Sequence, residues 1–117
     1  QALLKKHLAS MRYWRDDYHY RHKVARRDPV FLAGLASRLV HDMVQVLFAL
    51  NETYYVGDGN NLDFVRKFEH TPDGFAARVE RALYPPRRDD RYDAQYDLLV
   101  ELIDEVGELA RRLTNNL

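Results

Sequence analysis

The chain has 117 residues and no net formal charge, because 18 Lys or Arg residues balance 18 Asp or Glu residues. This length suits one domain with one core. The absence of cysteine excludes a disulfide scaffold, a thiol nucleophile and any cysteine-based metal site. No stretch approaches the roughly 20 apolar residues of a membrane span, and no signal peptide is visible. We therefore expect a cytoplasmic protein with no membrane partner.

The charge is unevenly distributed along the chain. Residues 1–27 hold eight Lys or Arg against two Asp, whereas residues 89–117 hold eight Asp or Glu against three Arg. Two explanations are open at this point. The two ends could pack side by side as complementary helices, or the basic end could meet an anionic partner.

The sequence predicts helices throughout and no strand. A first helix is expected over residues 2–27. Asp28-Pro29 then combines a preferred N-cap residue with proline at the first helical position. The second helix runs from there to about Tyr54, where the glycines and asparagines of residues 57–61 end it.

Three more helices follow, joined by short connections. Asn61 is the expected cap of a short helix over residues 62–70. Thr71-Pro72-Asp73 repeats the cap-then-proline pattern before a helix over residues 74–84.

Pro85-Pro86 should end that fourth helix. A long last helix starts at Asp89 or Asp90, and its apolar residues keep helical spacing to Leu113. Short connections favour antiparallel neighbours. The predicted fold is therefore all-α, an antiparallel bundle of about five helices forming a single domain over residues 1–117.

The second helix should be central, since apolar residues cover well over half of its circumference at 100° per residue. One polar stripe is left, formed by Arg38, His41, Asp42, Gln45 and Glu52. The stripe could simply face water. It could instead line a cleft, where His41 could move a proton and Glu52 could accept a proton or hold a hydroxyl.

The segment after this helix has two interpretations as well. Tyr54 and Tyr55 are amphipathic plates suited to a sugar or a base, and Gly57 and Gly59 permit a sharp turn and close approach of a ligand. The alternative is a capped helix end with two core tyrosines and a tight turn. No phosphate-loop pattern of the Gly-x-x-x-x-Gly-Lys-Ser/Thr kind occurs.

Residues 38–68, RLVHDMVQVLFALNETYYVGDGNNLDFVRKF, resemble the helical C-terminal domain that follows nucleotidyltransferase-fold domains. Such domains occur in bacterial nucleotidyltransferase-like proteins and, more distantly, in kanamycin nucleotidyltransferase. The shared pattern is Leu-x-x-Leu-Asn-x-x-Tyr followed by an aromatic residue, often Pro, and Gly. Here it is carried by Leu47, Leu50, Asn51, Tyr54 and Tyr55. Val56 stands where Pro is common, and the resemblance covers about residues 12–85.

This resemblance implies that the chain holds the substrate that receives the nucleotide. The nucleoside triphosphate and Mg²⁺ belong to a separate α/β domain, which carries a Gly-Ser motif and paired Asp residues on a strand. Neither feature is present here, since Asp16-Asp17 and Asp89-Asp90 are adjacent pairs at helices. We therefore expect no catalytic residue, metal ligand or cofactor in this chain itself.

The expected partners follow from the same resemblance. They are a nucleotidyltransferase catalytic domain, in cis or as a separate subunit, and an acceptor that is either a small molecule or a macromolecule. The first residue is Gln rather than Met, which fits the C-terminal part of a larger two-domain protein.

The resemblance also implies roles for individual residues. Glu52 or Asp58 would bind a substrate hydroxyl or amine, and Tyr54 and Tyr55 would pack on its rings. Lys67 or Arg38 would meet a phosphate. The predicted substrate-binding residues are Arg38, His41, Gln45, Asn51, Glu52, Tyr54, Tyr55, Asp58 and Lys67.

A second class of function is RNA cleavage by a HEPN-type helical domain, whose signature is Arg, four to six residues, then His. Arg12 with His19 and Arg15 with His22 both satisfy this loose pattern. In such a site, His moves a proton and Arg holds phosphate. The two histidines could also share a helix face, but no third ligand completes a convincing metal site.

A third class is RNA binding without catalysis. Residues 11–27 interleave Arg and Lys with Tyr13, Trp14, Tyr18 and Tyr20, the ingredients of a surface that stacks on bases and follows phosphates. The alternative is an amphipathic helix that buries a stripe containing Tyr13, Trp14, Tyr18 and, further on, Val24 or Ala25.

Overall fold

The computed structural model describes residues 2–16, 19–55, 57 and 59–114, and the only regular elements in this part of the chain are six α-helices. The all-α prediction is confirmed. The helices are α1 (Ala2–Asp16), α2 (His19–Arg26), α3 (Pro29–Leu50), α4 (Asn61–Val65), α5 (Phe75–Leu83) and α6 (Arg91–Thr114).

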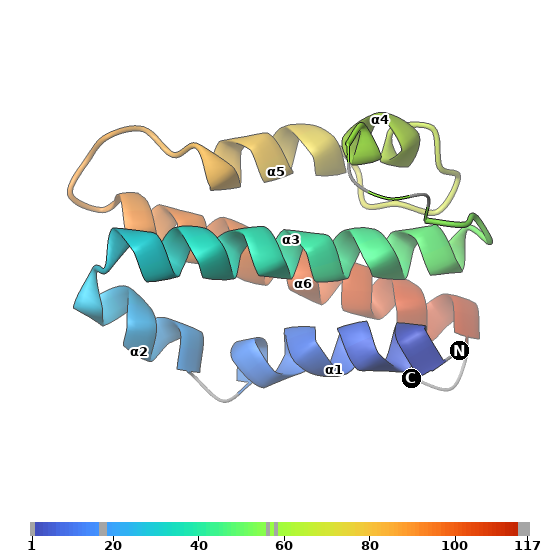
Figure 1. Ribbon diagram of the computed structural model, residues 1–117, viewed down its shortest axis with the longest axis horizontal. Coiled ribbons are helices and arrows are strands. Elements are labelled where there is room, and N and C mark those ends of the chain that lie inside the picture. The colour runs from blue at the N-terminus through green and yellow to red at the C-terminus, as the bar shows by residue number, and fades with distance from the viewer. Residues whose placement is uncertain (1, 17–18, 56, 58, 115–117) are drawn as a thin grey trace.

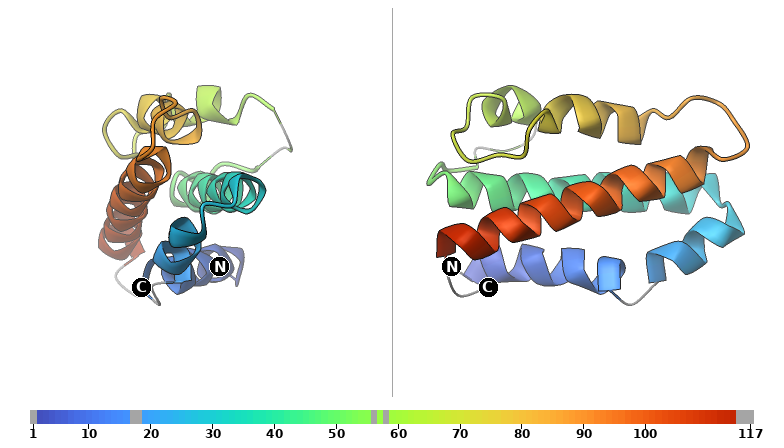
Figure 2. Two further views of the ribbon diagram at one scale, coloured as in Figure 1. Left: turned by 90° about the vertical axis from the view of Figure 1, so that its left-hand side faces the viewer. Right: turned by 180° about the vertical axis from the view of Figure 1, so that it is seen from behind.

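The helices form three layers (Figure 1). The long helices α3 and α6 lie side by side in the middle layer and run in the same general direction. The end-on view shows α4 and α5 on one side of this pair and α1 and α2 on the other (Figure 2). Both α1 and α5 run opposite to α3, and α5 is also antiparallel to α6, whereas α1 and α2 run in the same general direction, as do the central helices α3 and α6 (Figure 1).

The start of α3 is capped as the sequence predicts. The Asp28 carboxylate accepts hydrogen bonds from the backbone amides of Val30 at 3.0 Å and Phe31 at 3.3 Å, and Pro29 occupies the first turn. The helix ends at Leu50, four residues before the predicted end at Tyr54. Glu52 adopts a left-handed conformation with φ 51°, which an α-helix cannot continue through.

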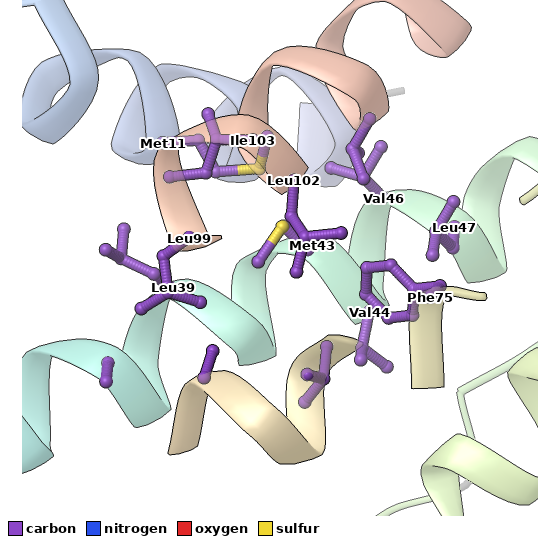
Figure 3. Packing of buried hydrophobic residues seen from close by; sticks show 14 of the residues in the cluster. Met11, Leu39, Met43, Val44, Val46, Leu47, Phe75, Leu99, Leu102 and Ile103 are labelled. Carbon is purple, nitrogen blue, oxygen red and sulfur yellow. The ribbon is translucent and has the colours of Figure 1, made fainter. Parts of the chain in front are cut away.

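The core surrounds α3, which is the central helix that its sequence predicts. Buried side chains from all six helices form the core. Figure 3 shows part of this core, including Met11 of α1, Met43 and Val44 of α3, Phe75 of α5 and Leu102 of α6. Each of these five residues is buried. Contacts on several sides explain why so much of the α3 circumference is apolar.

By length and composition, α3 is also apolar enough to cross a membrane, contrary to the expectation that no stretch comes near. Of its most apolar stretch, 56% is buried inside the bundle. A central core helix and a membrane span share this composition, and the packing around α3 accounts for it here.

The predicted first helix, residues 2–27, is two helices instead. Residues 17 and 18, including Tyr18, lie outside the described residues. The aromatic stripe of residues 11–27, predicted to be buried if this helix is amphipathic, is only partly buried, since Tyr13 is 47% exposed and Trp14 is half-buried. Tyr20 of α2 is fully buried and packs edge-on against Tyr96 of α6, with ring centroids 4.9 Å apart.

Burial gives the Tyr20 hydroxyl an unusual environment. Desolvation, with a smaller contribution from Tyr96, raises its pKa above the usual value. Its hydroxyl oxygen has no hydrogen-bond partner among the described residues, so Tyr20 acts here as a core side chain rather than a stacking surface for RNA.

The predicted caps of the two short helices are wrong. Asn61 lies inside α4, which follows Asn60 in a left-handed conformation and ends at Val65 rather than at residue 70. Helix α5 begins at Phe75 after Gly74, also left-handed at φ 63°, and no side chain caps it. Buried Thr71 Oγ1 has no partner among the described residues. Backbone reversals at positive φ, rather than side-chain caps, start these helices.

The basic N-terminal part lies against the acidic last helix. Arg15 of α1 makes a bidentate ion pair with Asp104 of α6, with distances of 2.9 and 3.1 Å. Arg27 pairs with Asp93 of α6 at 3.2 Å. The structure therefore shows the first of the two explanations for the uneven charge, in which the basic and acidic ends of the chain pack side by side. Exposed pairs of this kind add little stability but favour this pairing of segments.

A more buried ion-pair cluster joins α5 to α6. The Arg78 side chain is 14% exposed and donates to Glu101 at 2.7 Å and to Glu105 at 2.8 Å. The hydrogen bonds that Arg78 donates to Glu105 and Glu101 raise the Arg78 pKa above its ordinary range, and the Arg78 guanidinium lowers the pKa of the Glu105 carboxyl.

The Glu105 environment predicts acid-sensitive stability. The unfolded-state pKa of Glu is about 4.3, and the folded-state pKa of Glu105 is lower, so the folded state binds fewer protons in this range. Its contribution is present above about pH 4.3 and is lost as the pH falls through the folded-state value. In urea unfolding between about pH 6 and 3, Glu105→Gln should be less stable than the wild type near pH 6 and lose less stability on acidification.

A matched control is Glu69→Gln, because the Glu69 side chain is 87% exposed. We expect it to follow the wild-type pH profile. Identical pH profiles for Glu105→Gln and the wild type would contradict this account of the ion pair.

Candidate acceptor site

A hollow of about 390 Å³ lies between α3, α4 and α5. Its apolar walls come from Val40 and Val44 of α3 and from Val79 and Leu83 of α5. Polar side chains of α3, of the loop after it and of the start of α4 complete the lining of the hollow. The polar lining residues are Ser37, His41, Tyr55, Asn60, Asn61 and Asp63.

Tyr55 is positioned by packing on α3. Its ring lies edge-on against Phe48 with centroids 5.4 Å apart, and against His41 with centroids 5.7 Å apart. Its hydroxyl accepts a hydrogen bond from Asn61 Nδ2 at 3.3 Å. The loop after α3 therefore carries this tyrosine back over the helix, where it forms a wall of the hollow.

His41 is exposed on the hollow side and has a second imidazole on its other side. The His7 ring of α1 lies edge-on to it, with centroids 5.8 Å apart. His7 Nδ1 is 2.7 Å from Asp42 Oδ1, and the His7 and Asp42 side chains are only 13% and 7% exposed. With the proton on Nδ1, His7 donates to this carboxylate, which fixes the imidazole orientation.

The expectation that Asp42 belongs to an open polar stripe is wrong, since α1 covers it. Its second oxygen, Oδ2, is buried and has no partner among the described residues. The sequence also gives His7 no special role. The two residues are 35 positions apart, so no local spacing connects them, and the sequence places Asp42 in the polar stripe of α3 with no sign that it is buried.

Three other predicted residues gather at a second hollow, of about 380 Å³, beyond the end of α3. Asn51, Glu52 and Lys67 line it together with Leu50, Phe68, Glu69 and His70. Its lining is mainly polar, and Glu52 and Lys67 are exposed.

Asn51 has a structural task at this end of α3. Its amide nitrogen donates to the carbonyl oxygens of Leu47 and His70, both at 2.8 Å. Its side-chain oxygen accepts from the His70 amide at 2.9 Å. These bonds tie the end of α3 to the chain that follows α4, and they occupy both amide protons.

Three other predicted site residues line neither hollow. Arg38 is exposed and Gln45 is half-buried. Tyr54 is 93% exposed, so the alternative of two core tyrosines is wrong for this residue. Asp58 lies outside the described residues. The structure thus joins His41 with Tyr55 in one hollow, and Asn51 with Glu52 and Lys67 in another.

Two of the four residues in the RNA-cleavage pattern contact different partners. Arg15 is bound to Asp104, and His19 stacks on Tyr13 with ring centroids 4.7 Å apart. His22 is exposed. Within the described part of the chain, no three His, Asp or Glu side chains gather closely enough to hold a metal ion.

No protein family model matches this chain, and no curated protein or solved structure matches it significantly. Its function therefore has to be argued from these residues.

Proposed function

We propose that this chain is the acceptor-binding helical domain of a nucleotidyltransferase-like protein, and that the hollow lined by His41 and Tyr55 holds the acceptor. One observation carries the proposal. The segment that resembles the nucleotidyltransferase-associated domains contains the loop that follows α3, and in this loop Tyr55 lies against His41 and lines the hollow.

The lining of the hollow favours a small amphipathic acceptor. Its volume of about 390 Å³ lies within the usual range for small-molecule sites, which combine apolar walls with a few polar groups. The Tyr55 ring offers an edge or face to a sugar or aromatic ring. The Asn60 and Asn61 amides suit the hydroxyl and amine groups of such a molecule.

The catalytic chemistry belongs to another domain in this proposal. That domain, in cis or as a separate subunit, carries the nucleoside triphosphate and Mg²⁺, while this chain binds and orients the group that receives the nucleotide. Glu52 and Lys67 at the second hollow, with exposed Arg38, are then available to the catalytic domain or to phosphate groups.

The first test is the size of the native gene product, detected with an antibody against this domain. A band larger than this chain by about 10–20 kDa, the size of a typical additional domain, or a co-purifying catalytic subunit, is expected. The complete protein should then transfer a labelled nucleotide to a component of a small-molecule extract when Mg²⁺ is present. A free-standing chain with no such subunit and no transfer would contradict the proposal.

RNA degradation is the outcome that would favour the HEPN-type alternative. It would have to disappear in His19→Ala and His22→Ala variants. RNA that stays intact with the wild-type chain would remove this alternative.

A further inference from the structure

An arginine-rich pocket lies at the end of the bundle where α3 and α6 begin. The N-terminal ends of these two helices lie side by side there (Figure 1). The pocket has a volume of about 430 Å³, and four of its seven lining residues are arginines. The full lining is Arg27, Pro29, Arg87, Arg88, Asp89, Arg91 and Tyr92.

Two of these arginines are neutralised by the protein itself. Arg27 donates to the Asp93 carboxylate at 3.2 Å and to the backbone oxygen of Asp89 at 3.0 Å. Arg88 holds Asp90 with two hydrogen bonds, at 2.9 and 2.7 Å. These contacts shape the pocket but leave little of their charge for a ligand.

The other two arginines form no ion pair within the described residues, and together with the Asp89 carboxylate, which also lines the pocket, they leave it one net positive charge. Arg91 contacts the Tyr92 ring, with its guanidinium 4.9 Å from the ring centroid, and donates to the Tyr92 hydroxyl at 3.2 Å. It forms no ion pair within the described residues. Arg87 is exposed and forms neither a hydrogen bond nor an ion pair with any residue that the structure describes.

The nearby amides at the start of α3 do not add to this positive charge, because Asp28 already accepts from Val30 and Phe31. Recognition of an anion would therefore rest on guanidinium groups. Their planar forks match phosphate oxygens in pairs. A concave pocket with two free guanidinium groups suits one phosphate or diphosphate group, whereas a nucleic-acid strand needs a longer row of cations.

We propose that this pocket binds the phosphate or diphosphate group of a small phosphorylated ligand, held by Arg87 and Arg91. It is distinct from the hollow proposed for the acceptor, since His41 lies roughly 18 Å along α3 from Pro29. The phosphate site does not depend on the function proposed for that hollow.

The test is a titration of the chain with three separate probes: inorganic phosphate, ADP and a short single-stranded RNA. Binding is measured by changes in amide chemical shifts and by calorimetry, each at low and at moderate salt. The test variant is Arg87→Gln/Arg91→Gln. The matched control is Arg81→Gln/Arg112→Gln, which removes the same charge from two exposed arginines outside the pocket.

We expect ADP and inorganic phosphate to shift amides of residues 87–92, with salt-sensitive affinity. The test variant should lose about tenfold or more of the ADP affinity, as expected when charge-assisted hydrogen bonds are removed. The control variant should bind like the wild type. Absence of binding by both small probes, binding by RNA alone, or equal losses in the two variants would each overturn the proposal.

Discussion

Replacing His7 with alanine should lower the free energy of unfolding by about 3 to 5 kcal/mol, the usual effect of leaving a buried charged group without its partner, here the Asp42 carboxylate. His7 Nδ1 lies 2.7 Å from Asp42 Oδ1, and Asp42 Oδ2 has no partner among the described residues. The variant therefore leaves a buried carboxylate with neither oxygen satisfied. Urea unfolding at neutral pH, followed by far-ultraviolet circular dichroism, measures this loss.

Two further variants separate the buried pair from a general effect of losing histidine. His41→Ala removes the exposed neighbouring imidazole and should change stability by about 0.5 kcal/mol or less. His7→Leu combined with Asp42→Leu should recover most of the loss, because apolar groups replace both polar partners. A double variant as unstable as His7→Ala would show that the unpaired carboxylate is not the cause.

Replacing Phe48 with alanine should cost about 3 to 5 kcal/mol, the usual cost of emptying a buried phenylalanine site. Phe48 is 2% exposed. Its ring contacts Tyr55, Phe64 and Phe68, with centroid distances of 5.4, 5.9 and 5.0 Å. The change removes support from one wall of the hollow as well as from the core. Chemical unfolding gives the stability, and near-ultraviolet circular dichroism reports the order of the tyrosines.

The matched comparison for this prediction is Phe64→Ala. Phe64 belongs to the same aromatic group but is 42% exposed, so its removal should cost about 1 kcal/mol. Equal losses in the two variants would contradict the view that Phe48 is the residue on which this cluster is built.

The parts of the fold that depend on local chemistry could be predicted from the sequence. The Asp28 cap, the proline after it and the apolar residues that cover well over half of the α3 circumference act within one helix, and the structure reproduces all three. The helix ends depend on contacts between distant residues. Asn51 closes α3 through bonds to His70, and periodicity alone does not reveal a partner 19 residues away.

The candidate site could be predicted only in part for the same reason. From the sequence alone, Tyr54 and Tyr55 are equivalent candidates for binding a ligand ring. The backbone conformation of the loop determines that only Tyr55 packs on α3. The buried His7–Asp42 pair is invisible to local analysis, because the packing of α1 on α3 creates it. The two hollows likewise arise from the path of residues 51–70, which side-chain chemistry does not specify.

The most direct test of the acceptor site compares Tyr55→Ala with Tyr54→Ala in the complete protein, using whichever acceptor it labels. The two changes are chemically identical and adjacent, but only Tyr55 lines the hollow, whereas Tyr54 is 93% exposed. We predict that Tyr55→Ala raises the acceptor KM by about tenfold, which is the loss of one aromatic contact, and that Tyr54→Ala leaves it unchanged. An unchanged KM in Tyr55→Ala, or equal increases in both variants, would contradict the assignment of this hollow.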